Sequence, residues 1–240
     1  MWDRLWIDVH LATDASGTGQ PGGDTFGEIR NAAIAAKNGL IVWTGKQADL
    51  PDAPHKLAHE VISCGGQWLT AGLVDPHTHL VFAGDRSAEF AERLQGVSYA
   101  EIAQRGGGIL STVRATREAS EEELLEITLK RARRLVENGV TTVEIKSGYG
   151  LTLHDELKQL RVARAVGHAL PLRVHTTFLG AHALAPEYRG KQSEYVRHIC
   201  EEMLPAVAEA NLADSVDAFC EGIAFQPAEV ERIFDAANRY

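Results

Sequence analysis

Two histidines separated by one residue, His77 and His79, carry the clearest chemical signal in this sequence. They follow residues 68–74, an apolar run that predicts a buried strand. Residues two apart on a strand point to the same side of a sheet, so both imidazoles can reach one metal ion. Neutral imidazole is the commonest metal ligand among side chains. The alternative is a loop in which both rings bond only to backbone, but the preceding strand favours half of a metal site.

Three further side chains, Arg86, Tyr149 and His182, are candidates for binding a small molecule near that metal. A guanidinium can hold a carboxylate in bidentate fashion, although Arg86 can equally be a surface residue paired with Asp85. Tyr149 lies between glycines, which let the backbone approach a ligand or turn sharply. His182 follows a predicted strand and can shuttle a proton or donate a hydrogen bond to a substrate carbonyl. A structural histidine and a surface turn tyrosine stay open as alternatives on spacing alone.

Four other residues are weaker candidates, because a structural role explains each of them at least as well. Tyr99 either covers the site or belongs to the core. Lys146 is expected to be a capped surface lysine rather than part of a metal site. His175 falls within a predicted strand, and Glu221 follows the last one. The remaining histidines are expected on the surface, in turns or on helices: His10, His55, His59, His154, His168 and His198.

Residues 1–65 have the pattern of a small β-domain, which we expect to be part of a β-sandwich. Short apolar runs alternate there with glycine, proline and aspartate turns. Asn38-Gly39 is a strong two-residue hairpin signal between two such runs. The segment 14–24 is a polar, glycine-rich loop.

In residues 66–240 predicted strands alternate with predicted helices. This alternation predicts an α/β domain with a parallel sheet. We expect about the first four units of a (β/α)₈ TIM barrel. The active site of such a barrel lies at the C-terminal ends of its strands, and the candidate residues follow predicted strands there. The predicted strands are 68–74, 140–145, 172–178 and 215–219, and the predicted helices are 120–138, 153–166, 193–209 and 227–240.

Composition disfavours several other classes of protein. The 240 residues carry a formal net charge of −9, which argues against binding to a nucleic-acid backbone. No run of about 18 uncharged apolar residues is present, so we expect no transmembrane helix and no membrane partner. The cysteines are Cys64, Cys200 and Cys220. Being far apart and odd in number, they are typical of reduced, buried thiols in a cytoplasmic protein.

The sequence resembles the imidazolonepropionase family of the amidohydrolase superfamily over its whole length. The first of the motifs that carry the resemblance is shared across the superfamily, whereas Arg86 and the last two motifs are more specific to the family. These motifs are Leu73-Val-Asp-Pro-His-Thr-His79, Gly84-Asp-Arg86, Gly106-Gly-Gly-Ile109, Glu144-Ile-Lys-Ser-Gly-Tyr-Gly150 and Thr177-Phe-Leu-Gly-Ala-His182.

The resemblance implies an enzyme of the third step of histidine degradation in the cytoplasm. It implies metal-dependent hydrolysis of the lactam C–N bond of the small-molecule substrate 4-imidazolone-5-propanoate to N-formimidoyl-L-glutamate. One Zn²⁺ or Fe ion would be held partly by His77 and His79. Arg86, Tyr149 and His182 match substrate-contacting positions, and His182 is also the candidate catalytic group. A homodimer is one option for the assembly.

The family pattern extends beyond this chain. A third metal histidine with a nearby acid, and then a metal-binding aspartate, lie on later strands of the family's barrel. We therefore expect a truncated chain, weakly held metal and negligible turnover for these 240 residues alone. The alternatives are another amidohydrolase, such as a deaminase of a nucleobase-like ring, and a non-catalytic fragment.

Overall fold

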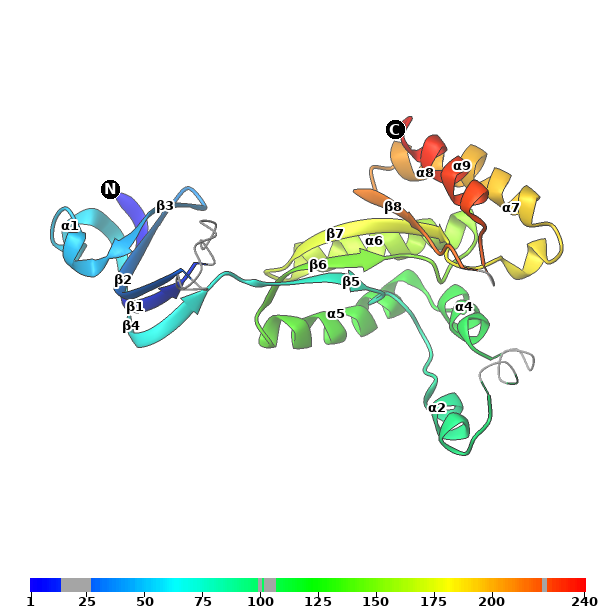
Figure 1. The fold of residues 1–240 in the computed structure, drawn as a ribbon, viewed down its shortest axis with the longest axis horizontal. Coiled ribbons are helices and arrows are strands. Elements are labelled where there is room, and N and C mark those ends of the chain that lie inside the picture. Colours follow the sequence, from blue (N-terminus) through cyan, green and yellow to red (C-terminus); the bar gives the residue numbers. More distant parts are fainter. Residues whose placement is uncertain (14–26, 99–100, 102–106, 222–223) are drawn as a thin grey trace, which may run out of the picture. The chain divides into compact units, whose positions relative to one another are not determined.

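The computed structural model describes residues 1–13, 27–98, 101, 107–221 and 224–240, and the chain divides into two compact units after Gly72 (Figure 1). Strand β4 (Ala58–Thr70) continues past residue 65, where the sequence predicts the boundary between the two domains. β4 pairs in parallel with β1 (Trp2–Ala12) as far as the partners Ala12 and Thr70. Residues 68–70, expected to begin the first barrel strand, therefore belong to the first unit.

The first unit contains a four-stranded sheet in the order β3-β2-β1-β4. Strands β2 (Glu28–Lys37) and β3 (Leu40–Lys46) form the predicted hairpin. Its turn residues Asn38 and Gly39 have φ of 51° and 75°, the left-handed pair that a type I′ turn requires. A 3₁₀ turn (Gln47–Asp49) and the short helix α1 (Pro54–Leu57) precede β4.

Alternation along the strands gives this sheet an apolar cluster on each face. Ala33 and Ala35 of β2 pack with Leu5, whereas Ala32 and Ile34 pack with a second cluster. The described residues of this unit form a single sheet, so the second layer of the expected sandwich stays a prediction.

The second unit is an α/β structure around a parallel sheet in the order β5-β6-β7-β8, which confirms the predicted α/β class and its parallel sheet (Figure 1). In the described residues the sheet is open, as half of a barrel would be. Its strands are β5 (Leu73–Thr78), β6 (Val140–Lys146), β7 (Arg173–Ala181) and β8 (Ser215–Ala218). The helices that alternate with them are α5 (Glu121–Glu137), α6 (Leu153–Ala169), α7 (Gln192–His198), α8 (Leu204–Glu209) and α9 (Pro227–Ala237).

Helix boundaries follow the predicted signals with two exceptions. The capping box of Ser120 and Glu123 starts α5 as expected. α6 runs through Gly167, the predicted stop, because the missing side chain lets the helix lie close to Val174 of β7. The long helix predicted over 193–209 is interrupted by a π-helical turn (Ile199–Met203), just before a proline that lacks a backbone N–H.

Two helices between β5 and α5 are not anticipated by the sequence patterns. They are α2 (Ser87–Leu94) and α4 (Ile109–Glu118), and a 3₁₀ turn (Pro186–Tyr188) follows β7. The short helix expected around 99–104 lies almost wholly outside the described residues. None of the described helices combines the length and apolar character that crossing a membrane would need.

The parallel sheet separates an apolar layer from a polar one. Val143 and Ile145 of β6 pack into a buried cluster with α5 and α6. The intervening residues Glu144 and Lys146 therefore point to the other face. The cysteines are free thiols, but the prediction that all three are buried is wrong: Cys64 and Cys200 are only partly buried, and Cys220, which lies beyond the end of β8, is exposed.

Candidate active site

The two predicted metal histidines lie next to each other where β5 ends. Their ring centroids are 5.8 Å apart. Thr78, between them, donates a hydrogen bond of 2.5 Å from Oγ1 to the Glu144 carbonyl oxygen, which pins the end of β5 to β6. His77 is exposed and His79 is half-buried. The sheet thus brings together the two imidazoles that the His-x-His spacing predicts.

His79 lies among aromatic rings from two other loops. Its ring stacks on His182 with centroids 4.8 Å apart and lies 5.3 Å from Tyr149. Burial, helped by the nearby His182 and His77, lowers the pKa of His79 to about 4. The imidazole is therefore neutral at pH 7, the form that binds a metal. Among the described residues, buried Nδ1 of His79 has no hydrogen-bond partner, as expected of a nitrogen reserved for a ligand.

The three predicted substrate residues line one cavity of about 290 Å³. Arg86 precedes α2, Tyr149 follows β6 and His182 follows β7. Phe219 closes one side, with its ring edge-on to His182 at 6.2 Å. The volume is at the small end of ligand sites. The two predicted metal histidines do not line this cavity, but His79 touches two residues that do.

Arg86 forms an ion pair with Glu89 of α2 rather than with Asp85. Its Nε lies 2.7 Å from Oε2 of Glu89, and the other oxygen of Glu89 accepts a hydrogen bond from the Gly108 backbone N–H. Asp85 instead accepts from the backbone and hydroxyl of Ser87. The charge of Arg86 also reaches Tyr149, whose pKa is raised by burial and partly lowered again by the guanidinium. Glu89 is a site residue that its place in the sequence does not reveal.

His182 is fixed by the loop that carries Tyr149. Its Nδ1 lies 3.0 Å from the Gly148 carbonyl oxygen, which can only accept, so Nδ1 carries the proton of this bond. Burial lowers the pKa of His182, which favours the neutral ring. A neutral ring held in this way has its lone pair on Nε2. It therefore lacks the second N–H that the predicted hydrogen bond to a substrate carbonyl needs.

Lys146 is buried, which corrects the expectation of a surface lysine. Its Nζ lies 3.0 Å from Oε1 of Glu144 and 2.9 Å from Oδ2 of Asp217, and Thr177 donates to the same Glu144 oxygen. Burial works to lower the pKa of Lys146, but its hydrogen bonds and the charges of Asp217 and Glu144 outweigh burial and raise it. The lysine is an interior cation on the polar face of the sheet.

The weaker candidates do not join the site. His175 is half-exposed, with Nε2 lying 2.7 Å from the Ser215 hydroxyl. Glu221 is exposed, and Tyr99 lies outside the described residues. In the described part of the chain no group of three or more His, Cys, Asp or Glu side chains could hold a metal ion. His77 and His79 fit two of the three ligands of a catalytic zinc, and a third ligand is not provided there.

Two buried residues of α6, Glu156 and Gln159, hold the loop of Tyr149 in place. The sequence patterns do not predict either of them as part of the site. Glu156 accepts hydrogen bonds from three backbone N–H groups of that loop. Gln159 accepts one from Tyr149 and donates one to Val81. A polar residue inside a helix gives no sign of burial, and only the glycines around Tyr149 hint that something lies close.

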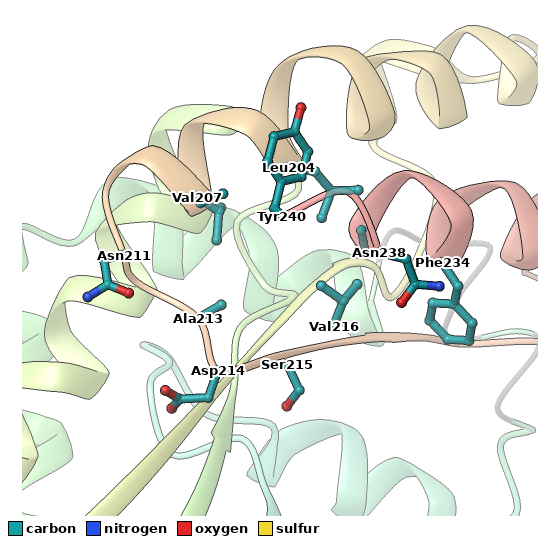
Figure 2. A pocket seen from close by; sticks show the side chains of 12 residues that line it. Leu204, Val207, Asn211, Ala213, Asp214, Ser215, Val216, Phe234, Asn238 and Tyr240 are labelled. Carbon is teal, nitrogen blue, oxygen red and sulfur yellow. The ribbon is translucent and has the colours of Figure 1, made fainter.

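A second pocket, of about 570 Å³, lies between α8, β8 and α9 (Figure 2). Its acidic side chain, Asp214, is already paired with Arg164 at 2.9 Å and accepts from the Thr176 backbone. No histidine or cysteine lines this pocket. This pocket therefore adds no histidine or cysteine to those at the ends of β5, β6 and β7.

Curated proteins of known name are similar to this chain over nearly all of its residues. Imidazolonepropionases from Ralstonia nicotianae, Pseudomonas entomophila and Caulobacter vibrioides are 56%, 54% and 54% identical over 237, 234 and 238 residues. These alignments cover 98–99% of this chain but 56–57% of each relative, so the chain spans little more than half the length of the proteins it matches. No family model matches the chain.

Solved structures that are 16% identical to this chain share its fold. A triazine hydrolase from Arthrobacter aurescens superposes with a TM-score of 0.63, covering 100% of this chain and 51% of that protein. Ochratoxinase from A. niger gives 0.59, covering 98% and 53%. A 5-methylcytosine deaminase from Klebsiella pneumoniae gives 0.51, covering 98% and 55%.

Proposed function

The chain belongs to the imidazolonepropionase family, matching the N-terminal part of those proteins, and we propose that its site serves the hydrolysis of 4-imidazolone-5-propanoate. In this reaction a water oxygen bonds to the lactam carbonyl carbon, the ring C–N bond breaks, and the departing nitrogen takes up a proton. The product is N-formimidoyl-L-glutamate. The proposal assigns the protein to the third step of histidine degradation in the cytoplasm.

The observation that carries this proposal is the single cavity shared by Arg86, Tyr149 and His182 beside His79. The substrate has an anionic propanoate arm and a flat polar ring. A guanidinium at one wall suits the carboxylate. The rings of Tyr149 and His182 lie 5.3 Å apart at another wall and suit the imidazolone. His182, with its lone pair on Nε2, is placed to accept a hydrogen bond from a ring N–H and is the candidate for moving a proton.

His77 and His79 would hold the metal ion, Zn²⁺ or Fe, on this side of the site. When bound, the metal supplies a water that is acidic enough to ionise near neutral pH. The low pKa of His79 keeps its imidazole available for this role well below pH 7. Lys146, held by Glu144 and Asp217, keeps its charge in the interior and is not a surface group.

The test compares the purified chain with the same chain joined to the C-terminal remainder of the Ralstonia nicotianae relative. We expect the chain alone to hold less than one metal ion and to show negligible turnover, because the described residues provide two ligands. The joined protein should hold about one ion and hydrolyse imidazolone propanoate. Turnover of cytosine or guanine instead, or hydrolysis and a tightly held ion in the chain alone, would contradict these expectations.

Arg86→Gln in the joined protein tests the assignment of the carboxylate. Loss of a bidentate charge contact should raise KM by about tenfold or more and change kcat less. Arg133→Gln is the matched control, since Arg133 is exposed on α5. Equal KM values for the two variants would remove Arg86 from the site.

A further inference from the structure

Helix α6 carries two fully buried polar side chains that do not line the cavity. Glu156 is 0% exposed and Gln159 is 1% exposed. Polar groups buried this deeply are normally hydrogen-bonded, and their partners indicate what they organise. Both side chains accept hydrogen bonds from a single short segment, residues 147–151, which links β6 to the start of α6.

The Glu156 carboxylate accepts several hydrogen bonds from this segment. Oε1 accepts from the N–H groups of Gly150 and Leu151 at 2.9 and 2.7 Å, and Oε2 accepts from that of Gly148 at 3.1 Å. The Ser147 hydroxyl also bonds to Glu156. The carboxylate lies near the N-terminus of α6, where the helix dipole favours a negative charge. Four donors from five consecutive residues leave this loop little freedom.

The loop then fixes the ring of His182. The Gly148 carbonyl oxygen lies 3.0 Å from Nδ1 of His182. Gly148 has φ of 106°, and a Cβ there would come within 2.9 Å of the His182 ring, so the backbone and the imidazole are in close contact. Ser147 Oγ accepts from the Leu179 N–H at 2.9 Å, and the Leu179 oxygen accepts from the His182 N–H. Both the ring and the backbone of His182 are thus tied to the segment that Glu156 holds.

Gln159 connects the same loop to the strand of the metal histidines. Its Oε1 accepts from the Tyr149 N–H at 3.0 Å, and its Nε2 donates to the Val81 carbonyl oxygen at 2.7 Å. Val81 is fully buried and lies two residues beyond His79. This amide supports Tyr149 against the segment that carries His79.

We propose that Glu156 is a positioning residue that holds His182 with its proton on Nδ1, leaving Nε2 as the hydrogen-bond acceptor of the cavity. Gln159 supports this arrangement by fixing Tyr149. The link between His182 and a ligand rests on the proposed function, whereas the tautomer of His182 is a property of the chain that can be measured without substrate.

The test is the tautomer of His182 in the ¹⁵N-labelled chain, recorded with a chelator present at about pH 8, where ordinary histidines are neutral. Loss of its signals in His182→Gln assigns them. In the unchanged chain we expect the proton almost wholly on Nδ1. Glu156→Gln replaces one acceptor by an NH₂ group that faces N–H donors, so the loop should loosen. The Nδ1–H population should fall to about half or less, and the loop amides should exchange about tenfold faster.

Glu126→Gln is the matched control, because Glu126 is exposed on α5 and pairs only with Lys130 among the interactions described for it. It should change neither measurement. If Glu156→Gln does not fold, Ser147→Ala tests the same chain of contacts, since it removes the link from the loop to Leu179, and it should also lower the Nδ1–H population. A variant with faster amide exchange but an unchanged His182 tautomer overturns the proposal. Failure of the joined protein to hydrolyse imidazolone propanoate would instead overturn only the proposed function.

Discussion

The two sides of the candidate site differ in how fully hydrogen bonds within the chain hold their residues in place. On one side, the loop of Tyr149 and His182 is held by Glu156 and Gln159, both of which are completely buried. On the other side, His77 is exposed on an edge strand of the described sheet. His79 has a buried Nδ1 without a hydrogen-bond partner among the described residues. The side proposed to bind substrate is therefore organised by the chain's own hydrogen bonds, whereas the side proposed to bind metal has few such contacts among the described residues.

The difference reflects how far apart in sequence the residues that make each set of contacts are. The acceptors for the Tyr149 loop come from residues five to ten positions along the chain, so one loop and one helix turn are enough to hold Tyr149 in place. A catalytic zinc site uses three protein ligands, and the proposed ligands from the local sequence are two, His77 and His79. The remaining ligands have to come from residues distant in sequence, because one strand cannot surround an ion.

The largest expected effect comes from removing the carboxylate on the organised side. Glu156→Ala leaves three buried N–H groups without acceptors, each costing about 1–3 kcal/mol, so the free energy of unfolding should fall by roughly 3 kcal/mol or more. His77→Ala should change it by less than about 0.5 kcal/mol, because His77 is exposed. Urea unfolding with a chelator present measures both. Similar losses for the two variants would erase the contrast between the two sides.

A smaller effect is expected from crowding the same loop. A Cβ at Gly150 would lie 2.6 Å from backbone atoms of Asp155 and Glu156, so Gly150→Ala has to push the loop away from α6. We expect a loss of about 2–3 kcal/mol in the free energy of unfolding.

Gly190→Ala is the control for the effect of any glycine substitution. Gly190 has φ of 78° and nothing within 4 Å of an added Cβ, so strain in the backbone alone should cost about 1 kcal/mol. Thermal or urea unfolding ranks the two variants. If Gly150→Ala is no worse than Gly190→Ala, the loop is not tightly packed against α6.

The smallest effect is the pH dependence of the metal side. Burial first, then the neighbouring His182 and His77, lower the pKa of His79 from 6.5 to about 4 in the folded chain. Below pH 6.5 the unfolded chain therefore binds a proton that the folded chain does not. Stability contributed by the neutral ring is present above that pH and is lost as the pH falls toward 4.

Metal-free chain should lose about 1–2 kcal/mol from this group between pH 7 and pH 5. His79→Phe keeps an aromatic ring there without the titration, so its stability should fall less over the same range. Urea unfolding at both pH values measures the difference between the two proteins. Equal pH dependence would show that His79 titrates normally and is not enclosed.

Much of the architecture follows from patterns that are local in sequence. The Asn38-Gly39 turn, the Ser120 capping box and the alternation of strands with helices each report a short-range preference, and the structure confirms all three. The sequence pattern does not locate the end of β4, because residues 68–70 fit equally well as the end of one strand or the start of another. Only pairing with β1 decides which they are.

The sequence by itself determined the residue types of the site: two imidazoles at one strand end, an arginine in the loop that follows, and a tyrosine and a histidine after the next two strands. The tertiary structure decided how they are used. It buried Lys146 between two carboxylates, turned Arg86 toward Glu89, and brought Nδ1 of His182 to 3.0 Å from the Gly148 carbonyl oxygen. The physical reason is that burial and hydrogen-bond partners depend on which segments meet in space, and a pattern along the chain does not contain that information.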